Sequence, residues 1–147
     1  MKNIKNIFKT LPIPCLLLEP KDGYFFIKDA NELYFKITEK TKEELIGMII
    51  PDIFPDNPEQ LGSNWKKVHN SLNRVLISGK PERIDNLRYD LLIPGLNEFE
   101  ERYWQLENIP VIDEITGIVN YIILSALDKT LEVLEQRKGP ELKEESA

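Results

Sequence analysis

Residues 29–47, which read DANELYFKITEKTKEELIG, contain the change of hydrophobic pattern that decides the fold. Asp29 is a good helix N-cap, and Glu32 stands three residues later, as in a capping box. Leu33 and Ile37 are four residues apart and would share one face of a helix. A helix is therefore expected to begin in this stretch, after a segment that has no helical spacing.

The preceding residues predict a β-hairpin. Residues 15–19 form a short apolar run, and residues 24–27 are mostly aromatic, which are both features of strands. The connection at residues 20–23 begins with Pro and ends with Gly, which suits a β-turn.

Further helices are predicted after this stretch. Thr41 and Glu44 repeat the capping pattern, and Gly47 is placed to end a short helix. Residues 51–54 predict one more helical turn, with Pro at its first position.

The longest helix inside the domain is expected over residues 65–78, because Ser63 or Asn64 can cap it and Gly79 follows it. Its apolar stripe consists of Trp65, Val68, Leu72, Val75 and Leu76.

The last third of the chain predicts strands. Residues 83–93, 98–108 and 118–127 show apolar alternation or β-branched and aromatic content. Turns at residues 94–97 and 113–117 would connect them as an antiparallel meander.

The order of these elements predicts an α+β fold. It is a five-stranded antiparallel sheet with the helical insert packed on one face, flanked by N- and C-terminal helices. We expect an amphipathic helix at residues 1–11 and the domain itself at residues 12–128. Residues 129–147 would start a C-terminal helix, over 129–138, and end in a mobile polar tail.

Composition narrows the class of function. A chain of 147 residues with 41% hydrophobic and 30% charged residues fits one globular domain. The net charge of -6 argues against a nucleic-acid partner, which needs clustered positive charge. One cysteine and one histidine leave little for a metal site or catalysis, and no apolar run is long enough to span a membrane. We therefore expect a soluble, cytoplasmic, non-enzymatic domain without a metal.

Three sets of motifs, in this order and spacing, resemble a PAS domain, the sensing module of bacterial histidine kinases. The first is LPIPCLLLE at residues 11–19, and the second is DANEL at 29–33 with Thr38 and TKEELIG at 41–47. The third set resembles a subgroup found in sensor kinases and phytochrome-like proteins, and reads RYD at 88–90, FEERYW at 99–104 and NIPVID at 108–113.

Residues 128–130, Asp-Lys-Thr, resemble the Asp-x-Thr exit motif of that family. The resemblance implies that Asp128 and Thr130 tie the last strand to an outgoing signalling helix. The function that it implies is a sensor that resembles the input module of a two-component histidine kinase. A ligand or partner would bias the packing of the fold, and the C-terminal helix would pass that bias to a kinase or other output domain.

The resemblance also implies a cavity between the sheet and the long helix, for an unidentified small molecule. The candidate pocket residues are Phe54, Trp65, Val68, Leu72, Tyr89 and Tyr103. The alternative is a filled core in a module that only dimerises, because aromatic residues at such positions are mostly core.

His69 is the candidate for a cofactor. It lies on the long helix, where haem-binding relatives of the family carry an axial histidine, and a neutral imidazole can ligate iron. The alternative is a half-exposed helix residue without a ligand, so no cofactor is expected, and haem remains an open alternative. An α+β isomerase or hydratase would also depend on His69, and no partner for such chemistry is evident.

Cys15 and the acidic residues favour structural roles. Cys15 lies in a strand-like run, which indicates a buried thiol rather than a flavin-adduct cysteine. Glu100 and Glu101 are adjacent on a strand and point to opposite faces, so they do not form a catalytic pair. Arg102 and Glu100 share a face, Arg88 is expected on the adjoining strand, and a cross-strand ion pair between Glu100 and Arg88 is the simpler interpretation.

The apolar face of the helix expected at residues 1–11 could form a contact between two subunits. This face consists of Ile4, Ile7, Phe8 and Leu11. That face must either fold back on its own sheet or pack against another subunit, and a homodimer is the expectation.

Overall fold

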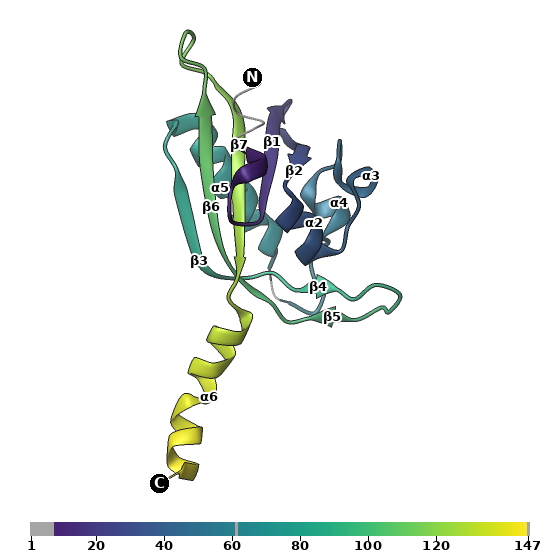
Figure 1. The fold of residues 1–147 in the computed structure, drawn as a ribbon, viewed down its shortest axis with the longest axis vertical. Coiled ribbons are helices and arrows are strands. Elements are labelled where there is room, and N and C mark those ends of the chain that lie inside the picture. The colour runs from purple at the N-terminus through teal and green to yellow at the C-terminus, as the bar shows by residue number, and fades with distance from the viewer. Residues whose placement is uncertain (1–7, 61, 147) are drawn as a thin grey trace.

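A computed structural model describes residues 8–60 and 62–146 of the chain, with side chains described as far as residue 138 (Figure 1). One helical turn at residues 8–10 precedes the first strand. The strands are β1 Cys15–Lys21, β2 Tyr24–Ala30, β3 Glu82–Arg88, β4 Leu91–Leu92, β5 Phe99–Glu100, β6 Tyr103–Ile112 and β7 Val119–Asp128. The helices are α2 Glu32–Thr38, α3 Lys42–Leu45, α4 Ile50–Ile53, α5 Asn64–Ser78 and α6 Thr130–Ser146.

The predicted sheet is confirmed. Five strands lie in the order β2-β1-β7-β6-β3, and all neighbours are antiparallel. Helices α2 to α5 come between β2 and β3 in sequence and lie together on one side of the sheet, as Figure 1 shows. The fold is therefore one sheet with one helical layer, and the main core lies between them.

The core explains why α5 takes this position. Val68, Leu72 and Val75 are buried and belong to the same cluster as Leu106 and Leu124 of the sheet. Burial of such side chains stabilises the fold by about 1.5–3 kcal/mol each. As predicted, the helix has a Ser63 cap and ends at Gly79, which has the left-handed conformation that favours glycine.

The start of α2 differs from the prediction. Asp29 belongs to β2, and Asn31 is the N-cap in its place. The Asn31 side chain accepts hydrogen bonds from the backbone N–H of Tyr34 at 3.0 Å and of Cys15 at 2.9 Å, and donates to the Ile13 carbonyl at 2.6 Å. Asn31 therefore fixes the helix start against the first strand, which Asp29 could not do from within β2.

Leu33 and Ile37 share one face of α2, as predicted, but it is not the buried face. Leu33 and Ile37 are exposed, whereas Tyr34 is buried in the core. The cause is the later helix start, because Asn31 as the cap turns the buried face toward Tyr34. The capping box of Thr41 and Glu44 in α3 is confirmed.

Two of the predicted strands are each broken. The segment 83–93 divides into β3 and β4, and the segment 98–108 divides into β5 and β6. Strands β4 and β5 form a separate hairpin that extends below α2 and α4 in Figure 1. The break lies at Asp90, whose buried carboxylate accepts from the Arg102 N–H at 3.2 Å and pairs with Arg88 at 3.0 Å.

The C-terminal helix is longer than predicted. Helix α6 continues to Ser146 through residues that we expected to form a tail, and it extends away from the sheet in Figure 1. The Glu, Leu and Lys residues at 141–145 have high helix propensity, which favours continuation of the helix. Pro140 lies inside this helix, where a proline removes one backbone hydrogen bond.

Candidate ligand pocket and exit junction

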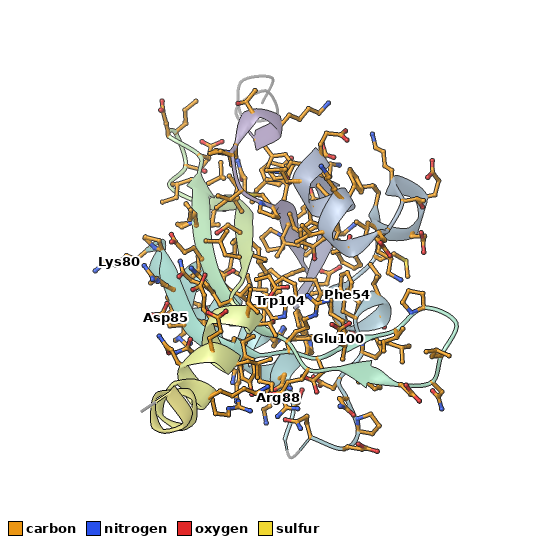
Figure 2. All side chains as sticks on the ribbon, turned by 60° about the horizontal axis from the view of Figure 1, so that its bottom comes forward. Phe54, Lys80, Asp85, Arg88, Glu100 and Trp104 are labelled. Carbon is orange, nitrogen blue, oxygen red and sulfur yellow. The ribbon has the colours of Figure 1, made fainter. Side chains whose placement is uncertain are left out.

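A pocket of about 60 Å³ lies between the helical layer and the sheet, and we call it the central pocket. Its lining residues are Tyr34, Ile37, Thr38, Ile50, Phe54, Val68, Leu87, Tyr89, Leu91, Trp104, Leu106, Leu124 and Ala126. Phe54, which follows α4, and Trp104, on β6, are labelled near the centre of the molecule in Figure 2. The pocket therefore has walls from both layers of the fold.

The predicted pocket residues divide into two groups. Phe54, Val68 and Tyr89 line the central pocket. Trp65, Leu72 and Tyr103 are not among the described residues that line it.

Each of these three side chains lies elsewhere for a physical reason. Leu72 is one turn beyond Val68 on α5 and is completely buried in the core. Trp65 is at the start of α5 and packs against His69, with 5.6 Å between ring centroids. Tyr103 precedes Trp104 on β6, and successive side chains of a strand point to opposite faces.

The polar side-chain groups of the residues that line the central pocket are three hydroxyls and the Trp104 indole N–H, which donates to the Tyr89 carbonyl at 2.9 Å. The Tyr89 hydroxyl donates to the Phe54 carbonyl at 2.6 Å, and the Thr38 hydroxyl donates to the Tyr34 carbonyl at 2.8 Å. The Tyr34 hydroxyl makes no hydrogen bond to any residue that the structure describes. Burial raises the pKa of both Tyr34 and Tyr89, so both phenols stay protonated. Sequence reasoning missed Tyr34 because it singled out Leu33 and Ile37 on this helix, which lie on a different face.

His69 lies outside the central pocket, in a separate groove of about 430 Å³ at the turn between β1 and β2. Its ring packs between Trp65 and Phe25, with 5.6 Å between ring centroids in each case. Its Nδ1 atom is buried and has no hydrogen-bond partner in the described part of the chain. The imidazole is therefore held by ring packing and is not presented to the central pocket, which does not fit an axial haem ligand there.

Cys15 has the structural role that its sequence context indicates. It is fully buried on the face of the sheet opposite the helical layer, in a small cluster with Phe8, Leu17 and Ile123 that we call the outer cluster. Burial raises the pKa of the thiol to about 11. The thiol is thus protonated and separated from the central pocket by the sheet.

The first helix folds back on its own sheet as far as the structure describes it. Phe8 is completely buried in the outer cluster, and Leu11 packs against that cluster. Ile4 and Ile7, the other predicted dimer residues, lie outside the described residues. Phe8 is therefore not a free contact for a second subunit in this arrangement.

Asp128 and Thr130 form what we call the exit junction, where β7 passes into α6. The Thr130 N–H donates to Asp128 Oδ1 at 2.9 Å, and the Tyr103 N–H donates to Thr130 Oγ1 at 2.9 Å. The Lys129 N–H donates to the Tyr103 carbonyl at 2.8 Å. The last strand, the first turn of α6 and the start of β6 are thus tied together at one point.

Arg102 supplies the positive charge of the exit junction. It forms ion pairs with Asp128 and with Glu100, the latter at 3.0 Å. Partial burial opposes ionisation of Asp128, but hydrogen bonds from Thr130 and Arg102 and the Arg102 charge outweigh it and lower the pKa. The predicted cross-strand ion pair between Glu100 and Arg88 was wrong, because Arg88 pairs with Asp90 and Glu100 pairs with its near neighbour Arg102.

A second contact, which sequence reasoning missed, holds α6 to the sheet. The Tyr103 hydroxyl donates to Glu101 at 2.7 Å and accepts from Arg137 at 2.8 Å. The Arg137 guanidinium also lies 5.6 Å from the centre of the Tyr103 ring, within cation–π range. Hydrogen bonding from Tyr103 lowers the pKa of Glu101. No sequence signal joins Arg137 to Tyr103, because they are distant in the chain.

We compared the chain with known families, curated proteins and solved structures to identify proteins of similar fold. No model of a known protein family matches the chain, and no curated protein does. Among solved structures, the PAS domain of BvgS from Bordetella pertussis has a TM-score of 0.64 at 22% identity, over 98% of this chain and 96% of that one. A sensory box sensor histidine kinase from Vibrio cholerae has a TM-score of 0.54 at 18% identity, over 86% and 90% of the two chains.

Light-oxygen-voltage (LOV) proteins are also similar in structure. The LOV protein of Rhodobacter sphaeroides has a TM-score of 0.64 at 13% identity, over 86% of this chain. This chain spans 65% of the length of that protein. The chain therefore has the fold of PAS and LOV domains, as the sequence motifs predict.

The residues present do not fit a flavin adduct, although a flavin analogue was used to study the mechanism of one similar LOV domain. The one cysteine of the chain lies on the opposite face of the sheet from the central pocket. Within the described residues there is also no group of three or more His, Cys, Asp or Glu side chains that could hold a metal ion. No helix among those residues is long and apolar enough to cross a membrane.

Proposed function

We propose that this chain is a non-enzymatic sensory module that converts a change in the central pocket into a change in α6. The observation that supports the proposal is the use of two strands for both purposes. Ala126 of β7 lines the pocket, and Asp128, two residues later, bonds to the first turn of α6. Trp104 of β6 lines the pocket, and its neighbour Tyr103 bonds to Thr130 and Arg137.

Because the residues that line the pocket and those that bond to α6 are only one or two positions apart on the same strands, a movement of the pocket wall reaches α6 directly. A ligand that spreads the helical layer from the sheet displaces Trp104 and Ala126, and the exit junction follows because it is part of the same strands. To move a two-state equilibrium from 1:99 to 99:1, a ligand must bind the two states with a difference of about 5.5 kcal/mol. A small pocket supplies only part of that difference, so we propose that a subunit interface in a cytoplasmic homodimer supplies the rest.

The proposed partner is a histidine kinase or another output domain joined after α6. The protein from Vibrio cholerae, which has this fold, is a sensor histidine kinase. An output domain fused to α6 would receive any rotation or tilt of that helix.

The test joins the chain through α6 to the catalytic part of a histidine kinase and measures autophosphorylation. Asp128→Ala removes the acceptor of the Thr130 N–H and the partner of Arg102, and should abolish the response while the domain remains folded. Asp113→Ala is the matched control, because Asp113 also accepts backbone N–H bonds, from Ile115 and Thr116, but at the far end of β7. A response that survives Asp128→Ala, or is lost equally in Asp113→Ala, would contradict this route.

Native mass spectrometry of the same protein measures subunit number and any bound molecule together. A dimer mass is the expected result. A mass increment equal to haem would support the alternative through His69, and a dimer without a retained ligand that signals through no added compound would support a module for dimerisation alone.

A further inference from the structure

We infer that the central pocket binds a small, uncharged molecule of fewer than about six non-hydrogen atoms, which accepts a hydrogen bond from the Tyr34 hydroxyl, and that the pocket is neither a flavin nor a haem site. This inference deepens the proposed sensory function, and rests on it only in taking the pocket as the sensing site. Four features of the pocket carry it: its size, its lack of charge, one hydroxyl without a partner and the position of its opening.

Size limits the ligand first. An apolar cavity of about 150 Å³ binds one benzene molecule, so a pocket of about 60 Å³ holds a smaller molecule than benzene. Pockets that enclose larger ligands and cofactors have roughly 300–1,000 Å³. The ring system of a flavin or a haem would therefore require separation of α5 from the sheet.

Charge limits it next. None of the described residues that line the pocket is Asp, Glu, Lys, Arg or His. Transfer of an ion into an apolar site without a counter-charge is strongly unfavourable. A carboxylate or ammonium ligand is therefore excluded, and the ligand is neutral.

The Tyr34 hydroxyl supplies the single specific contact. Tyr34 is 6% exposed and lines the pocket, and its hydroxyl has no partner among the described residues. The hydroxyls of Tyr89 and Thr38 already donate to backbone carbonyls. Because burial keeps Tyr34 protonated, it is a donor, and a ligand carbonyl or hydroxyl oxygen is the matching acceptor.

The opening lies beside α2. Ile37 lines the pocket and is nevertheless 42% exposed, so the pocket reaches the surface at this residue. Leu91 at the base of the β4–β5 hairpin also lines it. A ligand thus enters between α2 and the hairpin and reaches Tyr34, which is one turn before Thr38 on the same helix.

The experiment compares two probes of nearly equal shape in NMR titrations of the ¹⁵N-labelled chain. One is 2-butanone, which has an acceptor oxygen, and the other is 2-methyl-1-butene, in which a methylene group replaces that oxygen. Tyr34→Phe removes only the hydroxyl, and Tyr121→Phe is the matched control, because Tyr121 packs against the outer cluster.

We expect 2-butanone to shift the amide signals of Tyr34 and Ala126, and Tyr34→Phe to weaken it about three- to tenfold, as for one neutral hydrogen bond. The alkene should bind both proteins equally, and Tyr121→Phe should change neither probe. An unchanged 2-butanone affinity in Tyr34→Phe, or shifts confined to residues outside the pocket, would overturn the inference.

Flavin mononucleotide and haemin form the second arm of the experiment. Retention of either at one molecule per chain, with a visible absorption band, would also overturn the inference. Because these measurements read binding and not output, their failure is distinct from failure of the kinase fusion. A chain that binds 2-butanone through Tyr34 but signals unchanged in Asp128→Ala contradicts only the proposed route.

Discussion

The central pocket and the exit junction lie on the same two strands but have opposite chemistry. The pocket end of β6 and β7 presents Trp104 and Ala126 to an apolar space. The junction end presents Tyr103 and Asp128 to arginines and hydrogen-bond donors. The pocket is thus held by packing, which responds to shape, and the junction by directional polar contacts, which hold the outgoing helix at a defined angle.

The largest effect is expected in the core beside the central pocket, where packing dominates the stability. Leu72→Ala removes a completely buried side chain from the core beside the pocket and should lower the free energy of unfolding by about 2–5 kcal/mol. Urea denaturation followed by circular dichroism measures the change. Ile77→Ala on the exposed side of the same helix is the control, and an equal loss in both variants would refute the assignment of the buried face.

The second prediction concerns Asp90, which holds the base of the β4–β5 hairpin. Asp90→Ala leaves the Asn57 amide, the Arg102 N–H and the Arg88 guanidinium without their acceptor. We expect a loss of about 1–3 kcal/mol in the free energy of unfolding, since three half-buried donors lose their buried acceptor. Asp85→Ala, which removes an exposed partner of Arg83, should cost much less in the same urea experiment.

The third prediction separates the two regions by pH. Burial opposes ionisation of Asp90 and of Asp128, but their hydrogen bonds and arginine partners lower the pKa of both carboxyls. A lowered pKa adds stability above the ordinary value of an aspartate, and that stability is lost as the pH falls through the lowered pKa. Unfolding measured between about pH 7 and about pH 3 should therefore show a shrinking difference between the parent and Asp128→Asn.

A difference that stays constant or grows toward low pH would contradict this linkage. Leu72→Ala provides the comparison, because loss of an apolar side chain should cost the same free energy across this range.

The smallest expected effect is at the contact between Arg137 and Tyr103. Arg137→Ala removes the hydrogen bond to the Tyr103 hydroxyl, the ion pair with Glu101 at 3.4 Å and one cation–π contact, all made by an exposed guanidinium. Hydrogen exchange at the Val133 amide of α6 should rise by less than about fivefold, as for a surface pair. Glu135→Ala on the same helix is the control, and a much larger change in Arg137→Ala would mean that this contact, and not Asp128, anchors α6.

The sequence was sufficient to predict the layers of the fold but not the details of its polar contacts. Alternation and turn residues predicted the β-hairpin and the last strands, because a buried face imposes its own period. The cap of α2 was placed at Asp29 because an aspartate and a glutamate three residues apart satisfy the local pattern. Asn31 is the cap because its side chain also bonds to the segment before β1, which no local pattern reports.

Residues of the central pocket and the exit junction could be predicted where their role follows from their position along one helix or strand. They could not be predicted where the role depends on residues that are distant in the sequence. Val68 follows from the stripe of α5, and Asp128 and Thr130 follow from the motif that they resemble. Leu72 lies on the same stripe, but it is completely buried among core side chains, whereas Val68 borders the pocket. The stripe alone does not distinguish these two positions. Tyr34 required the observed helix start, and the role of Tyr103 required the position of Arg137 on α6.

The most direct test of coupling between the two regions is hydrogen exchange at the exit junction when the pocket is filled. Val68→Met places a larger side chain from α5 in the pocket and so fills part of it. Ile77→Met is the matched change on the exposed side of that helix. If the shared strands couple the two regions, exchange at the Thr130 and Val133 amides changes by more than about threefold in Val68→Met and stays at the parent rate in Ile77→Met. Parent rates at both amides in a folded Val68→Met protein would contradict this coupling.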